Sequence, residues 1–593
     1  MTIALDFETR PITVLTPYPE PVGLSITQGR TSQYLSWGHA RGNNCSRTEA
    51  RKRLYDIFKS GEQLVFFNAL FDCAAALHLG LKVPWQLVHD AQVLAFLHDP
   101  RARRLDLKST AERVLHQKPG ERDKLREWIQ THVPGARRKK KNWGAHIAEA
   151  PGDIVAPYAR GDTRRTLRLF NHWERLQRSE AYQRERSLLP ILSDMHEQGI
   201  PIDRARLARD LPTWERWVVE CERWLRKRLQ APGLDLSKAE DVAVACERRG
   251  MVDEWITNAA SDTISLSVES LRTLVVEGHF HDTEFVEVWA YYSYLDYILR
   301  TFVRPWLAHA EADGHLHATW AATRKEGAGA RTGRFSSSPN VQNIPKRVPT
   351  FRLPRGLRDR VGSPPSMRSY VIAPRGQVLV GADISQQELR ILAHFVGDPL
   401  STWYLEDPGL DLHLRIRDLI YQTTQMSLER NVVKVVNFCT IYGGGAQAVS
   451  EQAGCSKSDA YLFRQAHRQS LPGISDWDAR MHEKPYFETA GGRRYVPEPG
   501  WEYKDVNYAI QGSAADQLKE CMVDLAPKLR RLDARLALSV HDELVALAPT
   551  RAAREVRRLI KDTLEDTGVG RRLAMFTVPM VAETYTRKSW ESV

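Results

Sequence analysis

A short apolar run that ends on a carboxylate constrains the fold of this chain more than any other feature. Residues 378–382 read Val-Leu-Val-Gly-Ala and predict a buried strand, and Asp383 follows where that strand ends. The small residues at its end leave room for a close approach. Residues 387–392 then return to helical spacing. A carboxylate at the end of a core strand is costly unless a cation meets it, so the segment predicts a cation site.

A second acidic strand end follows later in the chain. Two apolar runs, residues 536–540 and 544–548, flank His541, Asp542 and Glu543 and predict a hairpin with acids at its tip. Two carboxylates on separate strands suit a pair of hard divalent cations that hold a phosphate. Two unrelated strand-end aspartates would give the same pattern, so the interpretation depends on the residues between them.

Between these acids, cations and aromatic rings recur at intervals of four. Arg430, Lys434, Phe438 and Tyr442 share one face of a predicted helix, and the valines within 432–436 form the opposite side. The glycines that follow Tyr442 end the helix. A solvated basic face would not explain why two rings continue the stripe. Cations for a triphosphate and rings for a base and sugar explain all four residues.

Together these three stretches resemble motifs A, B and C of the family A (polymerase I-like) DNA polymerases. The resemblance implies a DNA-directed DNA polymerase that extends a primer on a template. It implies two Mg²⁺, for which Mn²⁺ can substitute, held by Asp383 and Asp542. Glu543 is expected near the metals, and Lys434 is expected to protonate the leaving pyrophosphate.

The resemblance also implies nucleotide-binding residues. Asp411-Leu412-His413 matches a family position at which His contacts the incoming phosphates, although an isolated His413 would suggest a surface histidine. Glu388 matches the residue whose side chain occupies the space that a ribose 2′-OH would need. The expected nucleotide-binding residues are Arg430, Lys434, Phe438, Tyr442, His413 and Glu388.

Residues 331–345 are polar and punctuated by Gly and Pro, and they resemble the family segment that contacts the primer–template backbone and minor groove. Such contacts fix register without reading sequence. Residues 507–516 match a further family segment, whose Gln reads minor-groove acceptors common to all base pairs. The expected DNA-binding residues are Thr332, Arg334, Asn340, Gln342, Asn343, Asn507, Gln511 and His541.

Acids also lie at the edges of apolar elements near the N-terminus. Asp6 and Glu8 are two apart on a predicted strand, so both point to one face. Asp72 follows a second apolar run, and Tyr158 and Asp162 open a predicted helix. Four carboxylates and a phenol suit a two-metal site in which the phenol orients water.

In this order the N-terminal acids resemble the three motifs of the DEDD-type 3′–5′ exonucleases, in the variant with Tyr at the third motif. The resemblance implies that Asp6, Glu8, Asp72 and Asp162 bind Mg²⁺ and that Tyr158 orients the attacking water. Alternating strands and helices around them predict an α/β domain with a central mixed sheet. The activity implied is a proofreading 3′–5′ exodeoxyribonuclease.

The fold class expected is an α/β multidomain chain. An RNase H-like exonuclease domain is expected at residues 1–185, and a right-hand polymerase domain at residues 186–593. Within the second, the resemblance places the subdomains as follows: thumb about 204–310, palm about 311–395 and 505–593, fingers about 396–504. Trp214, Trp217 and Trp224 are expected to be core rather than ligand contacts. Because no 5′-nuclease domain precedes Met1, the chain resembles the compact bacteriophage form, and a role in phage DNA replication is expected.

Composition supports a polyanionic partner. The 84 Lys and Arg outnumber the 73 Asp and Glu, for a net charge of +11. Seven scattered Cys indicate a reducing cytoplasm, that of a bacterial host if the chain is phage-encoded, and argue against structural zinc. No signal peptide or membrane-spanning apolar run is evident. The expected partners are primer–template DNA and deoxynucleoside triphosphates, without a membrane. No dedicated processivity subunit is expected, because residues 204–310 carry no large insertion.

Some features leave alternatives open. The basic run 137–141 with Trp143 is expected to be a solvated loop, and contact with single-stranded DNA is the alternative. Four positions depart from the family pattern: Ile384, Gln387, Cys439 and Tyr503. A single-subunit RNA polymerase would lack the N-terminal motifs and Glu388, and a stand-alone exonuclease would leave most of the chain unexplained. A non-catalytic DNA-binding subunit would have lost acids that are all present here.

Overall fold

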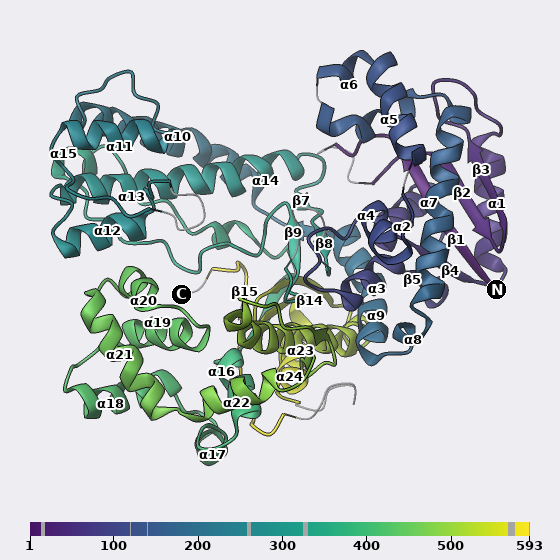
Figure 1. Cartoon of the computed structure of the whole chain (residues 1–593). Helices are drawn as coiled ribbons and strands as arrows, with labels where there is room; N and C mark the ends of the chain where they lie inside the picture. The colour runs from purple at the N-terminus through teal and green to yellow at the C-terminus, as the bar shows by residue number, and fades with distance from the viewer. Residues whose placement is uncertain are drawn as a thin grey trace.

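The N-terminal apolar runs form a five-stranded mixed sheet (Figure 1). The computed structural model describes residues 1–13, 18–118, 120–138, 140–257, 263–323, 330–566 and 576–591, without the side chains of residues 137–142. Strand β1 lies at the centre, antiparallel to β2 and parallel to β4, in the order β3-β2-β1-β4-β5. The strands are β1 (Thr2–Thr9), β2 (Pro21–Gln28), β3 (Thr31–Ser36), β4 (Gln63–Phe66) and β5 (Val88–Asp90). The mixed central sheet expected from the sequence is confirmed.

Helices cover both faces of this sheet. Alternate residues of β1 face opposite sides, so Leu5 packs with α1 and α2, whereas Ala4 packs with α3 and α7. Asp6 and Glu8 have the parity of Ala4 and therefore lie on the α3 and α7 side. The helices are α1 (Arg47–Lys59), α2 (Ala69–His78), α3 (Ala91–His98), α4 (Leu107–Leu115), α5 (Gly120–His132), α6 (Pro134–Arg138), α7 (Gly152–His172) and α8 (Glu174–Gln177).

Helix α9 (Glu180–Gln198) joins this unit to the rest of the chain. It packs on α2 and α3 and also on α23 (Asp505–Arg530) of the larger unit. The domain boundary expected at residues 185/186 therefore falls inside a continuous helix.

A buried ionic network lies along α9 and α23. It consists of Arg184 and Glu185 on α9, Asp516 and Lys519 on α23, and Arg493, and none of the five side chains is more than 1% exposed. We call these five residues the buried ionic network.

The next region is almost entirely helical. Its helices are α10 (Arg204–Arg228), α11 (Ala239–Arg248), α12 (Val268–Glu277), α13 (Thr283–Ile298) and α14 (Arg304–His309), with a π-turn η3 (Leu299–Val303). Trp214 is fully buried, and Trp217 and Trp224 pack half-buried against the same core, so the expectation of a core stripe is confirmed. Short pairs follow: β6 (Ile200–Pro201) with β7 (His315–Leu316), and β8 (Thr319–Ala321) with β9 (Ser336–Ser338). Helix α15 (Arg355–Arg358) precedes the second sheet.

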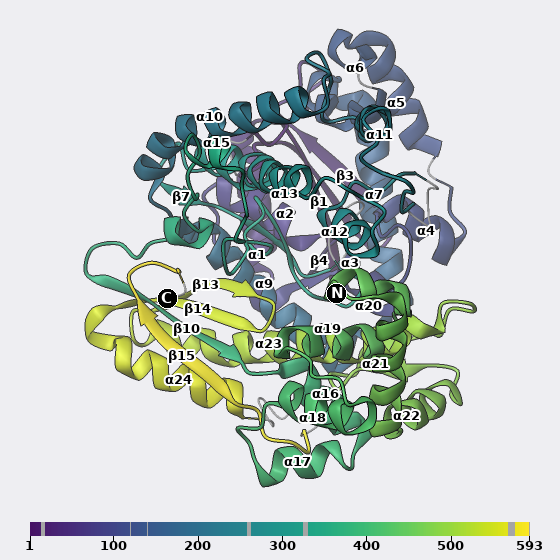
Figure 2. The ribbon, with the colours of Figure 1, turned by 90° about the vertical axis from the view of Figure 1, so that its left-hand side faces the viewer.

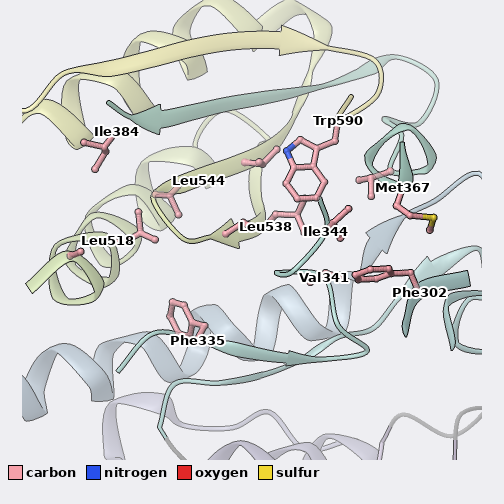
Figure 3. Packing of buried hydrophobic residues seen from close by; sticks show 14 of the residues in the cluster. Phe302, Phe335, Val341, Ile344, Met367, Ile384, Leu518, Leu538, Leu544 and Trp590 are labelled. Carbon is pink, nitrogen blue, oxygen red and sulfur yellow. The ribbon is translucent and has the colours of Figure 1, made fainter. Parts of the chain in front are cut away.

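A second, four-stranded antiparallel sheet has the order β13-β14-β10-β15. Its strands are β10 (Gln377–Ile384), β13 (Arg535–Val540), β14 (Glu543–Pro549) and β15 (Ala582–Arg587). Helices α23 and α24 (Ala553–Glu565) pack on it, on the side away from α10 and α13 (Figures 1 and 2). Its core joins side chains of the sheet to the segment before it, among them Phe335, Val341, Ile344, Leu538, Leu544 and Trp590 (Figure 3).

Another group of helices lies opposite α10 and α13, below them in both views (Figures 1 and 2). They are α16 (Gln387–Val396), α17 (Leu400–Glu406), α18 (Leu412–Thr424), α19 (Arg430–Ile441), α20 (Ala446–Ala453), α21 (Lys457–Ser470) and α22 (Gly473–His482), followed by the hairpin β11 (Phe487–Glu488) and β12 (Arg494–Tyr495). All seven cysteines are free thiols. Within the described ranges, no helix is long and apolar enough to cross a bilayer.

Candidate active sites

The register of the second sheet brings the two predicted strand-end acids together. Asp383, near the end of β10, lies opposite Glu543 at the start of β14. The Ile384 N–H donates to the Asp542 carbonyl at 3.1 Å, which ties β10 to the hairpin tip. His541 takes a left-handed φ of 55° there, so the chain reverses within two residues. The strand, the acid, the helix and the hairpin predicted from the sequence are all present.

The charges at this tip suit a cation site. Burial and the neighbouring Asp383 raise the pKa of Asp542 to about 7, because two carboxylates so close together resist ionisation. The Lys346 ammonium lies 2.6 Å from Asp383 Oδ2 and opposes this effect. Carboxylate oxygens are the ligands that hard divalent cations prefer, and the lysine shows that positive charge is accommodated here. The residues present therefore fit a divalent metal.

Glu543 is bound on both carboxylate oxygens. Its Oε1 accepts from the Trp590 indole at 2.9 Å and from the Tyr585 hydroxyl, and its Oε2 meets Arg368 at 3.2 Å. The Tyr585 ring reaches Glu543 by lying over Gly381, where an added Cβ would stand about 2.1 Å from the ring. The room left by Gly381 thus receives a side chain of β15.

Helix α19 carries the four-residue stripe as predicted. Lys434 is exposed, and Arg430 Nε donates to Asp411 Oδ2 at 2.6 Å. The Phe438 and Tyr442 rings stack with centroids 6.0 Å apart. Val433 and Val436 on the opposite side are fully buried, which fixes the face that the stripe presents.

His413 is buried rather than a surface histidine. Its Nδ1 lies 2.9 Å from Asn437 Nδ2, and its ring packs against Phe438. Burial lowers the pKa of His413 to about 4, so the imidazole is neutral at pH 7. With Asn437 donating, Nδ1 accepts and the ring proton lies on Nε2.

Glu388 joins three segments that are far apart in sequence. It lies in the first turn of α16, pairs with Arg334 and accepts a hydrogen bond from the Tyr442 hydroxyl. Gln511 of α23 also hydrogen-bonds Tyr442. Four of the predicted nucleotide- and DNA-binding residues therefore form one connected cluster.

The remaining predicted DNA-binding residues divide between buried and accessible. The Thr332 carbonyl accepts from Arg493, and Gln342 Nε2 donates to the Ser539 carbonyl at 3.1 Å. The Asn340 side chain caps the next turn, whereas Asn343 is exposed. The Asn507 side-chain oxygen is buried without a hydrogen-bond partner among the described residues.

A hollow of about 780 Å³ separates the two units. Its walls include Arg334, Asn343 and His541 on one side, and Asn68 and Phe71 of the N-terminal unit on the other. Gln342 and Asn340 also line it. The predicted DNA-binding segment therefore faces the N-terminal unit across an open space.

Three of the four N-terminal acids converge on a metal-sized space. Carboxylate oxygens of Asp6, Glu8 and Asp162 all lie within 4.8 Å of one another. Burial and Asp162 raise the pKa of Asp6 to about 7, and burial and Asp6 raise the pKa of Glu8 well above its ordinary value. Such crowding of buried carboxylates is relieved by a divalent cation, so this donor set also fits a metal.

Asp72, the fourth predicted ligand, is not part of that three-acid group. It is buried in the first turn of α2, and its Oδ1 accepts from the Phe7 N–H at 2.8 Å. The bond fixes α2 to the strand between Asp6 and Glu8. Asp90, an acid that our sequence-based predictions did not include, accepts from the Asn68, Ala69 and Gln92 amides and so fixes the start of α2.

Lys108 is a site residue that the sequence analysis missed. Its ammonium pairs with Asp162, donates to the Tyr158 hydroxyl at 2.8 Å and lies 4.2 Å from the Tyr158 ring centre. Nothing in the neighbouring sequence marks this lysine as inward-facing. The basic run 137–141 lies outside the side chains that the structure describes; Trp143 beside it packs edge-on against Tyr158 at 6.0 Å.

We expect Lys108→Met to lower stability mainly in the absence of metal. The substitution leaves Asp162 with Arg165, at 3.4 Å, and takes the Lys108 charge away from Asp6 and Glu8, which costs about 1–3 kcal/mol. Added Mg²⁺ should restore most of the loss by supplying positive charge to the same acids. Thermal unfolding at pH 8, in EDTA and in Mg²⁺, measures both the loss of stability and its recovery. Lys82→Met, at an exposed lysine, is the control, and an equal loss with and without Mg²⁺ would contradict this role.

Comparisons with known proteins agree with this architecture. Residues 246–592 match the family described as DNA polymerase family A. The chain is 31% identical to DNA polymerase I, thermostable, from Thermus aquaticus over 611 residues, which cover 97% of this chain and 64% of the relative. It is 34% identical to DNA polymerase I from Deinococcus radiodurans over 297 residues, which cover 47% of this chain and 28% of the relative. The chain thus spans less than two thirds of the length of these relatives.

A solved structure shares the fold across both units. It is the POL domain of Pol1 from M. smegmatis in complex with DNA primer-template and dNTP, with a TM-score of 0.74 and 20% identity. The match covers 99% of this chain and 95% of that one. The shared fold is that of the POL domain. The family match over residues 246–592, more than half of the chain, shows that the chain belongs to DNA polymerase family A.

Proposed function

We propose that this chain extends a primer on a DNA template and that its N-terminal unit removes nucleotides from the primer 3′ end. The observation that carries the first activity is the pairing of β10 with the hairpin tip, which sets Asp383 opposite Glu543 and beside Asp542, while helix α19 lies near the same end of the sheet (Figure 2). The relatives named DNA polymerase I and the Pol1 complex with primer-template and dNTP support primer–template DNA and deoxynucleoside triphosphates as substrates.

The proposed synthesis is an in-line phosphoryl transfer. Two Mg²⁺ held by Asp383 and Asp542 would supply positive charge that activates the primer 3′-OH and stabilises the triphosphate, and Mn²⁺ would supply the same chemistry. Lys434, exposed on α19, neutralises the phosphates and protonates the leaving pyrophosphate. Arg430 exchanges its pairing with Asp411 for the phosphates.

His413 and Glu543 take positioning roles in this proposal. A neutral His413 reaches the phosphates as a hydrogen-bond donor through Nε2–H rather than as a cation. Glu543, bound by Arg368, Tyr585 and Trp590, holds the hairpin tip against β15 and so sets where Asp542 lies. Its carboxylate keeps these partners during the reaction.

Template and primer contacts follow from the cluster around Glu388. Arg334, Gln511 and His541 lie near the hairpin tip and offer donors to minor-groove acceptors. The Phe438 and Tyr442 rings offer stacking surfaces to the incoming base and the templating base. Thr332, Asn340, Gln342, Asn343 and Asn507 complete the wall that holds the duplex.

The proposed exonuclease uses the same two-metal chemistry at Asp6, Glu8, Asp162 and Asp72. Tyr158 orients the attacking water, because its hydroxyl lies beside Asp162 and burial raises its pKa well above the ordinary value, so it stays protonated. The hollow lined by His541 and by Asn68 lies between the hairpin tip and the N-terminal unit, and it is the path that we propose for a frayed 3′ end.

Primer extension on a defined template, with each deoxynucleotide supplied alone, tests the proposal. Extension only by the complementary deoxynucleotide is the expected result. Extension by ribonucleotides without a primer would indicate an RNA polymerase, and degradation without extension would indicate a stand-alone exonuclease. DNA binding without either reaction would indicate a non-catalytic subunit.

We expect Glu388→Ala to raise ribonucleotide insertion relative to deoxynucleotide insertion at least tenfold. The Glu388 side chain fills the space next to Tyr442, and its removal would admit a 2′-OH without a clash or a badly paired carboxylate. A tenfold change corresponds to about 1.4 kcal/mol of lost discrimination. Single-nucleotide insertion kinetics give the ratio, and Glu406→Ala, an exposed acid on α17, is the control. An unchanged ratio would remove Glu388 from the sugar pocket.

A further inference from the structure

A stripe of five cations covers the outer face of α24 and the turn before it. Arg551, Arg554, Arg558 and Lys561 follow one another at helical spacing, and Arg557 flanks them. The opposite face of the helix is apolar and buried against the sheet. We call these five residues the basic stripe.

Folding does not account for this charge. Arg551 pairs with Asp533, and Lys561 pairs with Glu565 four residues along. Arg554, Arg557 and Arg558 are exposed and have no ion pair anywhere in the described ranges. Like charges at these spacings destabilise a helix, so three unpaired arginines on one face cost stability unless an anion meets them.

The stripe also borders a hollow. A space of about 700 Å³ is lined by the five cations, Glu555 and Thr584 of β15. Among the residues that the structure describes, no apolar side chain lines it. A protein partner would need aromatic or aliphatic anchors at the centre of its interface, whereas guanidinium groups match phosphate oxygens in a bidentate geometry. The chemistry of the lining therefore favours a phosphodiester backbone over an acidic protein.

The position of α24 keeps the basic stripe apart from helix α19. Helix α24 lies on the side of the second sheet away from α10 and α13, and helix α19 lies apart from α24 in both views (Figures 1 and 2). From Arg551 to Lys561 the helix advances about 15 Å at 1.5 Å per residue, a length over which a duplex presents several phosphates. A strand bound here does not compete for the α19 stripe.

We propose that the basic stripe is a second nucleic-acid site that holds a phosphodiester backbone without reading bases. This proposal rests on the proposed function only in taking DNA as the ligand. Binding at the basic stripe requires neither catalytic centre. The shared chemistry is the phosphate backbone, and it can come from a single strand or from a duplex segment.

The test is a second binding event on the full chain. The protein is first saturated with an unlabelled primer–template hairpin in EDTA, so that the proposed primer–template site is occupied and neither reaction runs. A fluorescent oligo(dT) strand, and in a separate arm a fluorescent duplex, is then titrated by anisotropy at low salt. Additional 1:1 binding of either probe is expected, and the arm that binds identifies the source.

Charge reversal identifies the surface. The triple variant R554E/R557E/R558E should weaken the second event at least tenfold and lower its salt slope by about 2, because each lost phosphate contact removes roughly 0.7–0.9. The control K52E/R53E/K82E makes the same charge change at exposed cations of the N-terminal unit and should change affinity less than threefold. Thermal unfolding confirms that both variants fold.

Several results would overturn the proposal. Absence of a second event with either probe would do so, as would equal weakening by both triple variants, which would indicate only the overall charge. Binding of a fluorescent polyglutamate peptide that depends on the stripe, with no binding of nucleic acid, would assign the surface to an acidic protein instead.

Discussion

Replacing Asp383 or Asp542 by Ala should abolish primer extension and leave degradation of single-stranded DNA intact. Each substitution removes one of two neighbouring carboxylates, so a divalent metal held there would lose a ligand. We expect a loss of at least about 1,000-fold, which corresponds to about 4 kcal/mol of transition-state stabilisation. Extension and degradation are measured on the same preparations, with a labelled primer–template and a labelled single strand.

The reciprocal variant tests whether each activity belongs to its own acid cluster. Asp6→Ala with Glu8→Ala removes two of the three converging acids of the N-terminal unit and should abolish degradation while extension continues. Glu112→Ala, at an exposed acid of α4, should change neither activity. A folded Asp383→Ala or Asp542→Ala protein that lost both activities would show that the two acid clusters do not act as separate sites.

Local patterns in the sequence predicted local structure well. The apolar run before Asp383, the hairpin around His541 and the stripe of α19 all occupy the elements expected, because each depends on periodicity within one segment. The parity of Asp6 and Glu8 on β1 likewise sets both acids on one face. Motif spacing could therefore place most of the candidate site.

Long-range pairing decided what the sequence could not show. The space beside Gly381 receives the Tyr585 ring because β15, from the end of the chain, pairs with β10. Gln387, which departs from the family pattern, is buried and donates to Gln517 of α23 at 2.9 Å, a partner 130 residues away. Neither contact leaves a signal in the segment that contains it.

The two lysines at the acid clusters illustrate the same limit. Lys108 and Lys346 lie against Asp162 and Asp383, yet a lysine in a polar segment usually predicts a solvated side chain. Which lysine lies near each acid cluster becomes clear only once the fold is known. The burial of His413 could not be predicted for a related reason, since its hydrogen-bond partner Asn437 lies on the next helix.

The buried ionic network gives the second large effect, this time on stability. Asp516 pairs with Arg184 at 2.9 Å and with Arg493, and Lys519 pairs with Glu185 at 2.8 Å. Burial alone would raise the pKa of Asp516, but Arg184 and Arg493 outweigh it and hold the pKa below its ordinary 3.8. The carboxylate is therefore charged throughout the neutral range, and its contribution is lost only as pH falls through that lowered pKa.

Asp516→Ala should destabilise the protein by about 3–5 kcal/mol, because it leaves two fully buried arginines without their shared counter-ion. The urea midpoint, followed by tryptophan fluorescence, measures the loss. Asp524→Ala on the same helix is the matched control, since Asp524 pairs with Lys528 at a partly exposed position where the cost is about 0.5 kcal/mol or less. Equal effects of the two variants would show that the network contributes no more than a surface pair.

The same variant should also loosen the segment that we propose to hold DNA. Arg493 donates to the Thr332 carbonyl, and an added Cβ on Gly333 would stand within about 1.7 Å of its guanidinium, so the 331–334 segment rests directly on this side chain. Once Asp516 is removed, Arg493 keeps Glu185, at 3.4 Å, as its counter-ion, and its support of that segment weakens. Hydrogen exchange of residues 331–334 should then rise in Asp516→Ala but not in Asp524→Ala, and primer–template affinity should fall with it. Faster exchange without weaker binding would separate this segment from the DNA site.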